Sequence, residues 1–119
     1  MSEPIFWTLE ATIEDGKRQE LEQLLAGAVE ETQANESTAL VYEFFVGEDG
    51  KRFFALERYA DSAAAMAHLG AIAPKLGPLF GCFDGPPTMN IYGTASDELR
   101  AATTDLQPTF FGSIGGFRR

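Results

Sequence analysis

Hydrophobic and polar side chains alternate over residues 5–13. The side chains that face one way are Ile5, Trp7, Leu9, Ala11 and Ile13, and those that face the other are Phe6, Thr8, Glu10 and Thr12. This two-residue period is typical of a β-strand. Similar runs predict strands at residues 38–46, 52–59 and 88–94, with a hairpin turn at residues 47–50. A fifth strand is expected over residues 109–117, weakened by Gly112, Gly115 and Gly116.

Between the first two strands the hydrophobic period lengthens to that of a helix. One stripe contains Leu21, Leu24, Leu25, Ala28, Val29 and Thr32. It predicts an amphipathic helix from Lys17 to about Gln33, with Asp15 as its N-cap. A short helix near the other end of the chain is expected after a Ser96 cap and before Pro108.

A second long helix is predicted from a cap at Asp61 or Ser62 to about Ala73. Its candidate core residues are Met66, Leu69, Ile72 and Ala73. Pro74, Gly77, Pro78 and Gly81 follow, and such residues break helices. We therefore expect a short helical turn and a loop over residues 74–85.

The predicted order is β-α-β-β-α-β, followed by a helix and a strand. The first six elements give the ferredoxin-like plan, an α+β fold with an antiparallel sheet and both helices on one face. The length of 119 residues is that of one domain, which we expect to span residues 1–119.

The central strands carry large hydrophobic side chains on both faces. In residues 52–59, Phe53, Ala55 and Tyr59 oppose Phe54 and Leu56. The helices can cover only one face of the sheet, so the other needs a partner. A second copy of the chain is the simplest partner, and it predicts a homodimer with a barrel-like interface. The alternative is that residues 96–119 fold back over the sheet within one chain.

Composition excludes several classes of function. The net charge is −9, which disfavours nucleic acid and anionic membrane surfaces. There is no apolar run long enough to span a membrane and no signal-peptide pattern at the N-terminus. Cys82 is the only cysteine, which favours a cytoplasmic location and is otherwise read as an inert thiol. One Cys and one His do not make a metal site, so no metal is expected.

His68 and Glu57 are the candidate catalytic residues. His68 borders the hydrophobic stripe of its helix and has a free pKa near neutrality, so it could act as a base on a phenolic substrate. Glu57 lies among aromatic and aliphatic neighbours, where a carboxylate must be paired or have a raised pKa. Its partner would be Arg52, His68, a tyrosine or water. The alternatives are a histidine with a local structural contact and a carboxylate in a cross-strand ion pair at a subunit interface; Glu43 allows the same two interpretations.

Aromatic side chains suggest a pocket for a flat ligand. The candidates are Trp7, Tyr42, Tyr59, Phe80, Phe83 and Tyr92. The alternative for each of them is ordinary core or interface packing.

A longer motif follows the third strand: Glu57-Arg-Tyr-Ala-Asp-Ser-Ala-Ala-Ala-Met-Ala-His68-Leu. It resembles the antibiotic biosynthesis monooxygenase family, as do Asp15-Gly-Lys17, Tyr42-Glu43 and the tail segments at Tyr92–Arg100 and residues 115–118. The resemblance implies a dimeric α+β barrel. It also implies oxidation of a small aromatic (a quinol, phenol or anthrone-like compound) by dioxygen without a cofactor. By position, His68 corresponds to the family's helix histidine and Glu57 to its strand acid.

The sequence departs from the haem-degrading members of that family. The first strand has no Asn, His68 stands where those relatives have a tryptophan, and the stretch from Pro74 to Phe80 has no His. We therefore expect an aromatic oxygenase rather than a haem-degrading enzyme. The alternatives are a non-catalytic dimeric module that binds a small aromatic or a protein, and an isomerase or cyclase on the same fold.

Overall fold

The computed structural model describes residues 3–119, so the first two residues of the expected domain lie outside the described part. The elements follow in the order β1 (Ile5–Thr12), α1 (Arg18–Asn35), β2 (Ala39–Val46), β3 (Arg52–Tyr59), α2 (Ser62–Phe80), β4 (Thr88–Tyr92), α3 (Asp97–Ala102), a 3₁₀ turn (Thr104–Leu106) and β5 (Thr109–Phe111). The predicted ferredoxin-like α+β order is confirmed, including the additional C-terminal helix and strand.

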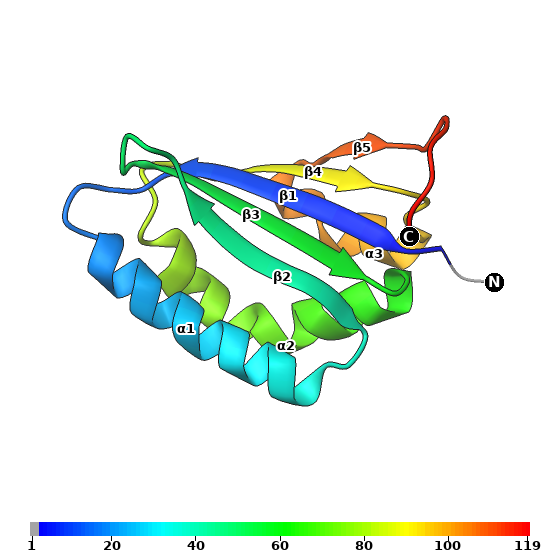
Figure 1. The fold of residues 1–119 in the computed structure, drawn as a ribbon, viewed down its shortest axis with the longest axis horizontal. Coiled ribbons are helices and arrows are strands. Elements are labelled where there is room, and N and C mark those ends of the chain that lie inside the picture. The colour runs from blue at the N-terminus through cyan, green and yellow to red at the C-terminus, as the bar shows by residue number, and fades with distance from the viewer. Residues whose placement is uncertain (1–2) are drawn as a thin grey trace.

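Within residues 3–119 the strands form one sheet in the order β2-β3-β1-β4-β5. Strands β1 to β4 pair with one another in antiparallel orientation, and β5 runs parallel to β4. α1 and α2 lie side by side against one face of this sheet, and α3 lies beneath β4 and β5 (Figure 1). The opposite face of the sheet is left open.

The core lies between the sheet and the helices, because alternate strand residues point inward. In β3, Phe53, Ala55, Glu57 and Tyr59 are buried on this side. Leu21 of α1 and Ile72 of α2 pack with Phe53 at one end of the core. Trp7 and Tyr59 pack at the other end, with ring centroids 4.7 Å apart. The positions predicted from the alternation in β1 and β3 are therefore correct.

The helix caps agree with the sequence at two of three sites. Asp61 accepts a hydrogen bond from Ala64 N at 2.8 Å, and Ser96 accepts one from Leu99 N at 3.1 Å. Asp15 does not cap α1, because residues 14–17 close a turn in which Lys17 N donates to Glu14 O. That turn includes Gly16 at φ +83°, and the helix begins only after Lys17.

The predicted end of α2 near Ala73 is wrong, because the helix continues to Phe80 through Pro74 and Pro78. A proline removes the hydrogen bond to the carbonyl four residues earlier, which here belongs to Gly70 and to Pro74. Both prolines and Gly70 are exposed, so water can hydrogen-bond to the freed carbonyls. The hydrophobic stripe also continues through Leu76 to the buried Leu79, which holds this part of the helix on the core.

Three strands also differ from expectation. β4 ends at Tyr92 rather than at residue 94. β5 stops at Phe111, and the glycine-rich residues beyond it lie exposed outside the sheet. In β2 the register shifts between Ala39 and Val41. This irregularity breaks the strict alternation, so that Leu40 is 50% exposed while Tyr42 packs inward.

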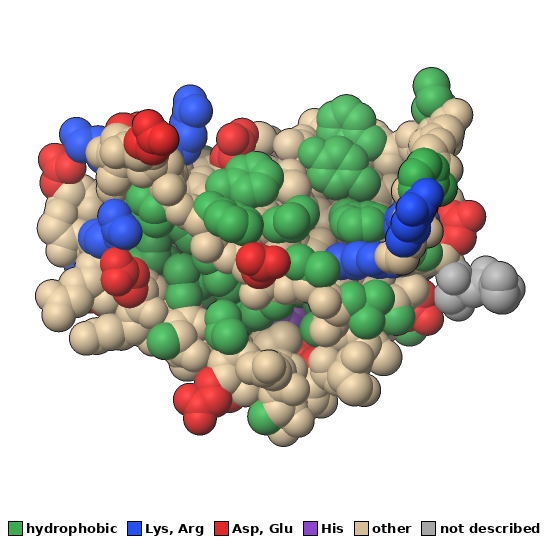
Figure 2. Space-filling view, in the orientation of Figure 1, with side chains coloured by type: hydrophobic (Ala, Val, Ile, Leu, Met, Phe, Trp, Pro, Cys, Tyr) green, Lys and Arg blue, Asp and Glu red, His purple; other side chains and the backbone are tan. Residues whose placement is uncertain are grey.

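Side chains from all five strands cover the open face of the sheet. They include Phe6, Val41, Phe45, Phe54, Leu56, Tyr92 and, from β5, Phe111. Phe45 is 47% exposed and Phe111 is 45% exposed. Figure 2 shows hydrophobic side chains gathered over the strands with few charged groups between them. One chain therefore leaves a hydrophobic surface in contact with water.

Candidate active site

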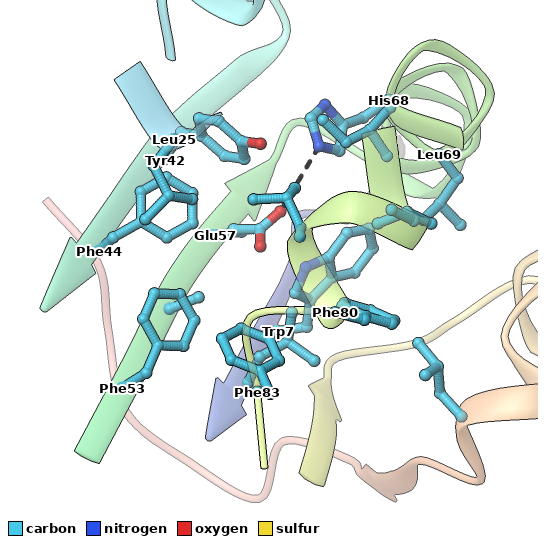
Figure 3. A pocket seen from close by; sticks show the side chains of 16 residues that line it. Trp7, Leu25, Tyr42, Phe44, Phe53, Glu57, His68, Leu69, Phe80 and Phe83 are labelled. Carbon is cyan, nitrogen blue, oxygen red and sulfur yellow. Dashed lines mark ion pairs between the residues drawn. The ribbon is translucent and has the colours of Figure 1, made fainter. Parts of the chain in front are cut away.

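A small hydrophobic cavity of about 60 Å³ lies between the sheet and the two long helices. Its walls come from β1, β2 and β3 on one side and from α1, α2 and the segment after α2 on the other (Figure 3). The residues that line it are Trp7, Leu9, Leu25, Tyr42, Phe44, Phe53, Ala55, Glu57, His68, Leu69, Ile72, Leu76, Leu79, Phe80, Phe83 and Leu106. The ionisable groups of this lining are the carboxyl group of Glu57, the imidazole of His68 and the phenol of Tyr42. The cavity thus combines a hydrophobic interior with one acid and one base.

Glu57 is held in the cavity wall by strand geometry. Its side chain is 6% exposed and points toward the helices, while its neighbour Arg58 points to the open face. Tyr59 lies two residues further along the same face, and its hydroxyl donates a hydrogen bond to Glu57 Oε1 at 2.6 Å. Burial raises the pKa of Glu57, against the opposing effects of Tyr59, His68 and the indole of Trp7.

His68 lies between two carboxylates. Its Nδ1 is 2.9 Å from Glu36 Oε1, and its Nε2 is 3.7 Å from Glu57 Oε1. The imidazole side chain is 2% exposed, and it contacts the rings of Tyr42 and Tyr59 at centroid distances of 5.0 and 5.1 Å. The Nε2 side of the ring faces the cavity beside Glu57 (Figure 3).

Glu36 was not identified from the sequence. It is the C-cap residue of α1, where the negative end of the helix dipole disfavours an anion. Contact with His68 offsets this cost, and the Glu36 side chain is only 15% exposed. The acidic outer face of α1 concealed it, because Glu30 and Glu31 nearby are exposed and solvated. Glu36 contacts His68, which is 32 positions further along the chain, so only the tertiary fold brings the two side chains together.

Tyr42 of β2 is the third polar group of the cavity lining. Its pKa is raised, chiefly by burial and then by the charge of Glu57, while a hydrogen bond with Thr32 acts in the opposite direction. The phenol therefore stays protonated and presents a neutral hydroxyl beside His68. Such a group can bind an oxygen atom of a ligand without adding charge.

Of the six aromatic residues predicted to line a pocket, Trp7, Tyr42, Phe80 and Phe83 line this cavity. Tyr59 lies behind Glu57 and His68 and acts on them through its hydroxyl and ring. Tyr92 lies elsewhere: it is on the open face of β4, stacks on Phe111 with ring centroids 5.2 Å apart, and lies 3.3 Å from Thr8 Oγ1. It faces outward because the inward positions of β4 belong to Met89 and Ile91.

The other candidate groups lie away from the cavity. Glu43 is exposed on β2. Cys82 is buried, and its thiol lies 3.4 Å from Glu20 Oε2; burial and this carboxylate raise the thiol pKa. Among residues 3–119, no cluster of three His, Cys, Asp or Glu side chains has the geometry to hold a metal ion. In the same range, no helix is both long enough and hydrophobic enough to span a bilayer.

Chemically, the site offers a base and an acid in a water-poor space. His68 Nε2 can accept a proton from a bound hydroxyl or activated C–H group. Glu57, with its raised pKa, can hold or return a proton nearby. Both groups are fixed by hydrogen bonds to residues outside the cavity, which keeps their orientation constant.

Several solved structures share the fold of this chain. MupZ from Pseudomonas fluorescens superposes over 100% of this chain and 91% of its own, with a TM-score of 0.86 and 22% identity. Rv0793 from Mycobacterium tuberculosis covers 79% of this chain and 97% of its own, with a TM-score of 0.68 and 18% identity. A structure called antibiotic biosynthesis monooxygenase covers 77% of this chain and 99% of its own, with a TM-score of 0.67 and 18% identity. No curated protein matches the sequence.

These structural likenesses establish the fold. The family itself is identified by a sequence match over residues 4–73 to the family model described as antibiotic biosynthesis monooxygenase. The matched range runs from β1 into α2 and contains both Glu57 and His68. The resemblance seen in the sequence is thereby confirmed: the chain belongs to the antibiotic biosynthesis monooxygenase family.

Proposed function

We propose that this protein is a cofactor-independent monooxygenase that oxidises a small aromatic quinol, phenol or anthrone-like compound with dioxygen. The observation that carries the proposal is the position of His68 Nε2, 3.7 Å from Glu57 Oε1, in the wall of a cavity lined by aromatic and aliphatic side chains. Membership of the family supports the class of reaction. His68 and Glu57 are the proposed catalytic residues.

In the proposed reaction His68 removes a proton from the bound substrate. The electron-rich anion then reduces dioxygen, so that one oxygen atom enters the substrate and the other leaves as water. For an anthrone this converts a CH₂ group to C=O, with the two hydrogens leaving in the water. The hydrophobic walls exclude bulk water, which would otherwise solvate the anion and stabilise it against oxidation.

The cavity must widen to admit such a substrate. A volume of about 60 Å³ holds only a few water molecules, whereas ligand pockets usually measure about 300–1,000 Å³. Trp7, Tyr42, Phe80 and Phe83 are the residues proposed to contact the ring. Displacement of the flexible side chains Leu69 and Leu76 on α2 is the simplest source of space, because both are only partly buried.

Oxygen uptake in the presence of anthrones and quinols tests the proposal. Wild-type protein should consume oxygen in proportion to product, and His68→Gln should lower the rate by about 10²- to 10⁴-fold, the usual contribution of a general base. Tyr92→Phe, on the opposite face of the sheet, is the matched control and should retain the rate. Equal rates for wild type and His68→Gln would refute the role of His68. Ligand-induced thermal shifts without any turnover would favour a binding module instead.

A second candidate, an isomerase or cyclase, is favoured by the raised pKa of Glu57. A carboxyl group whose pKa is raised by burial holds a proton more readily, and proton transfer between a carboxyl group and a nearby imidazole needs no oxidant. The same assay under anaerobic conditions separates the two reactions. Product formed without oxygen would establish the isomerase or cyclase, and product that requires oxygen would establish the monooxygenase.

We further propose that the protein works as a homodimer formed through the open face of the sheet. Phe45 and Phe111 are about half exposed there, and Arg58 Nε is buried without a hydrogen-bond partner among the described residues. A second sheet would cover the hydrophobic side chains and bring polar groups to Arg58. Residues 112–119 are all exposed, and Arg118 lies over the ring of Phe6 at one end of this face, while Phe45 of β2 remains 47% exposed.

A cytoplasmic location completes the proposal. It is supported by the single cysteine, Cys82, which lies buried as a free thiol. Expression of a fluorescent fusion in the native host would test it.

A further inference from the structure

Glu36 and His68 form a contact that joins the end of one helix to the interior of another. Glu36 Oε1 lies 2.9 Å from His68 Nδ1, and an acceptor in this position fixes a proton on Nδ1. In the neutral ring the opposite nitrogen, Nε2, is then without a proton, and this side of the ring faces the cavity beside Glu57.

The two nitrogens of the His68 ring differ in how closely a carboxylate approaches them. At 3.7 Å, the separation from Glu57 Oε1 is longer than a hydrogen bond, and that oxygen already accepts the Tyr59 hydroxyl at 2.6 Å. The lone pair of Nε2 is therefore available to a ligand in the cavity. Only the Nδ1 side of the ring is hydrogen-bonded by the protein.

The position of Glu36 carries a cost that the fold has to offset. It caps the C-terminus of an 18-residue helix, where a carboxylate meets the negative end of the helix dipole, and its side chain is 15% exposed. The groups that face His68 are Glu36 at the end of α1, Tyr42 on β2, and Glu57 and Tyr59 on β3. Of these groups, Glu36 is the carboxylate within hydrogen-bond distance of the ring.

We propose that Glu36 is a positioning residue that holds His68 as the Nδ1–H tautomer, so that Nε2 serves as the proton acceptor of the cavity. When a substrate X–H binds, the Nε2 lone pair forms the new N–H bond and the X–H electrons remain on X. The resulting imidazolium is stabilised by Glu36 at Nδ1 and by Glu57 near Nε2. The catalytic part of this inference rests on the proposed function, but the tautomer is a property of the free protein.

The chain contains a single histidine, so nuclear magnetic resonance can read its tautomer without assignment. Long-range ¹H–¹⁵N correlation spectra of ¹⁵N-labelled wild-type protein should be recorded from about pH 6 to about pH 9.5, a range that spans the ordinary histidine titration. We expect Nε2 to lose its proton while Nδ1 keeps one. A neutral ring protonated at Nε2, an average of both tautomers, or a ring that stays doubly protonated throughout would overturn the proposal.

Two variants test whether Glu36 is the cause. Glu36→Ala should shift the ring to the Nε2–H form or to a mixture of tautomers, and Glu30→Ala, the same change at an exposed position of α1, should leave the wild-type spectrum unchanged. A wild-type spectrum in Glu36→Ala would overturn the assignment. The wild-type measurement decides the tautomer even where Glu36→Ala does not fold. Because no substrate is present, these results are independent of the oxygen-uptake assay: a confirmed tautomer with no turnover would reject only the proposed function.

Discussion

Tyr59 donates a 2.6 Å hydrogen bond to the carboxylate of Glu57, two residues earlier on the same face of β3. Both side chains are buried, and Tyr59 is 0% exposed. The tyrosine hydroxyl thus provides a donor to a carboxyl group that has been removed from water. The geometry of the cavity wall depends on this pair.

Removing the Tyr59 hydroxyl should destabilise the protein. Tyr59→Phe leaves a buried carboxyl group without its donor, which costs about 1.5–3 kcal/mol in the free energy of unfolding. Tyr92→Phe is the matched control, because the Tyr92 hydroxyl lies at the longer distance of 3.3 Å from Thr8 at a partly buried site. Its cost should be about 0.5–1 kcal/mol. Urea unfolding of both variants measures the difference, and equal losses would contradict the importance of the Tyr59–Glu57 pair.

Glu57 should make the stability of the protein depend on pH. Its pKa in the folded protein is raised above the ordinary value of 4.5, so the folded state binds a proton more tightly than the unfolded state. The associated stability is fully present below pH 4.5 and is lost as pH rises through the folded pKa. The free energy of unfolding of the wild type, relative to Glu57→Gln, should therefore fall as pH increases from 4.5.

Chemical unfolding at a series of pH values measures this difference. Glu43→Gln, the same change at an exposed position on β2, is the control. The free energy of unfolding of the wild type relative to Glu43→Gln should not fall in this way. If it fell as steeply as the difference from Glu57→Gln, the effect would come from overall charge rather than from the buried carboxyl group.

Gly93 should tolerate no side chain. It has φ +107°, and a Cβ at this position would lie 2.8 Å from the carbonyl oxygen of Pro4. Gly85 also has positive φ, +92°, but has no neighbour within 4 Å of such a Cβ. Gly85→Ala should cost about 1–2 kcal/mol from backbone strain alone, and Gly93→Ala should cost more because the backbone around Pro4 must move. Thermal unfolding compares the two, and equal losses would show that the clash relaxes freely.

A charge on the open face should break the proposed dimer. Leu56 lies on this face in β3, an interior strand of the sheet, opposite Thr8 and Glu43 on the two neighbouring strands. Leu56→Glu should shift the protein from dimer to monomer in sedimentation, because a buried unpaired carboxylate costs several kcal/mol. Ala67→Glu, at an exposed site on α2, should leave the dimer intact. A wild-type protein that sediments as a folded monomer at micromolar concentration would contradict the dimer itself.

The sequence predicts most of the fold because the strands have a clear period. β3 was assigned its observed bounds, and the caps at Asp61 and Ser96 were recognised from residue type alone. The extension of α2 beyond Pro74 was not predictable from local preference, since the packing of Leu76 and Leu79 overrides the two prolines. The shortened β5 shows the opposite effect: glycine-rich sequence without a covering partner does not stay in the sheet.

The candidate site was predicted in part. His68 and Glu57 stood out because each is a polar residue in a hydrophobic pattern, and the structure brings them within 3.7 Å. Glu36 gave no such signal among the other acidic residues of α1. Residue type alone suggests Tyr92 as a pocket residue, although alternation with Met89 and Ile91 directs it to the other face. Contacts between elements distant in sequence required the structure.

The two prolines of α2 have a consequence for how the cavity opens. The carbonyls of Gly70 and Pro74 lack helical partners, so the backbone between them and Pro78 is restrained by fewer hydrogen bonds than the rest of the helix. This same segment carries Ile72 and Leu76 into the cavity wall. Bending this segment outward therefore breaks fewer backbone hydrogen bonds than bending an uninterrupted helix of the same length, and it would move Leu76 together with the wall that the side chain belongs to.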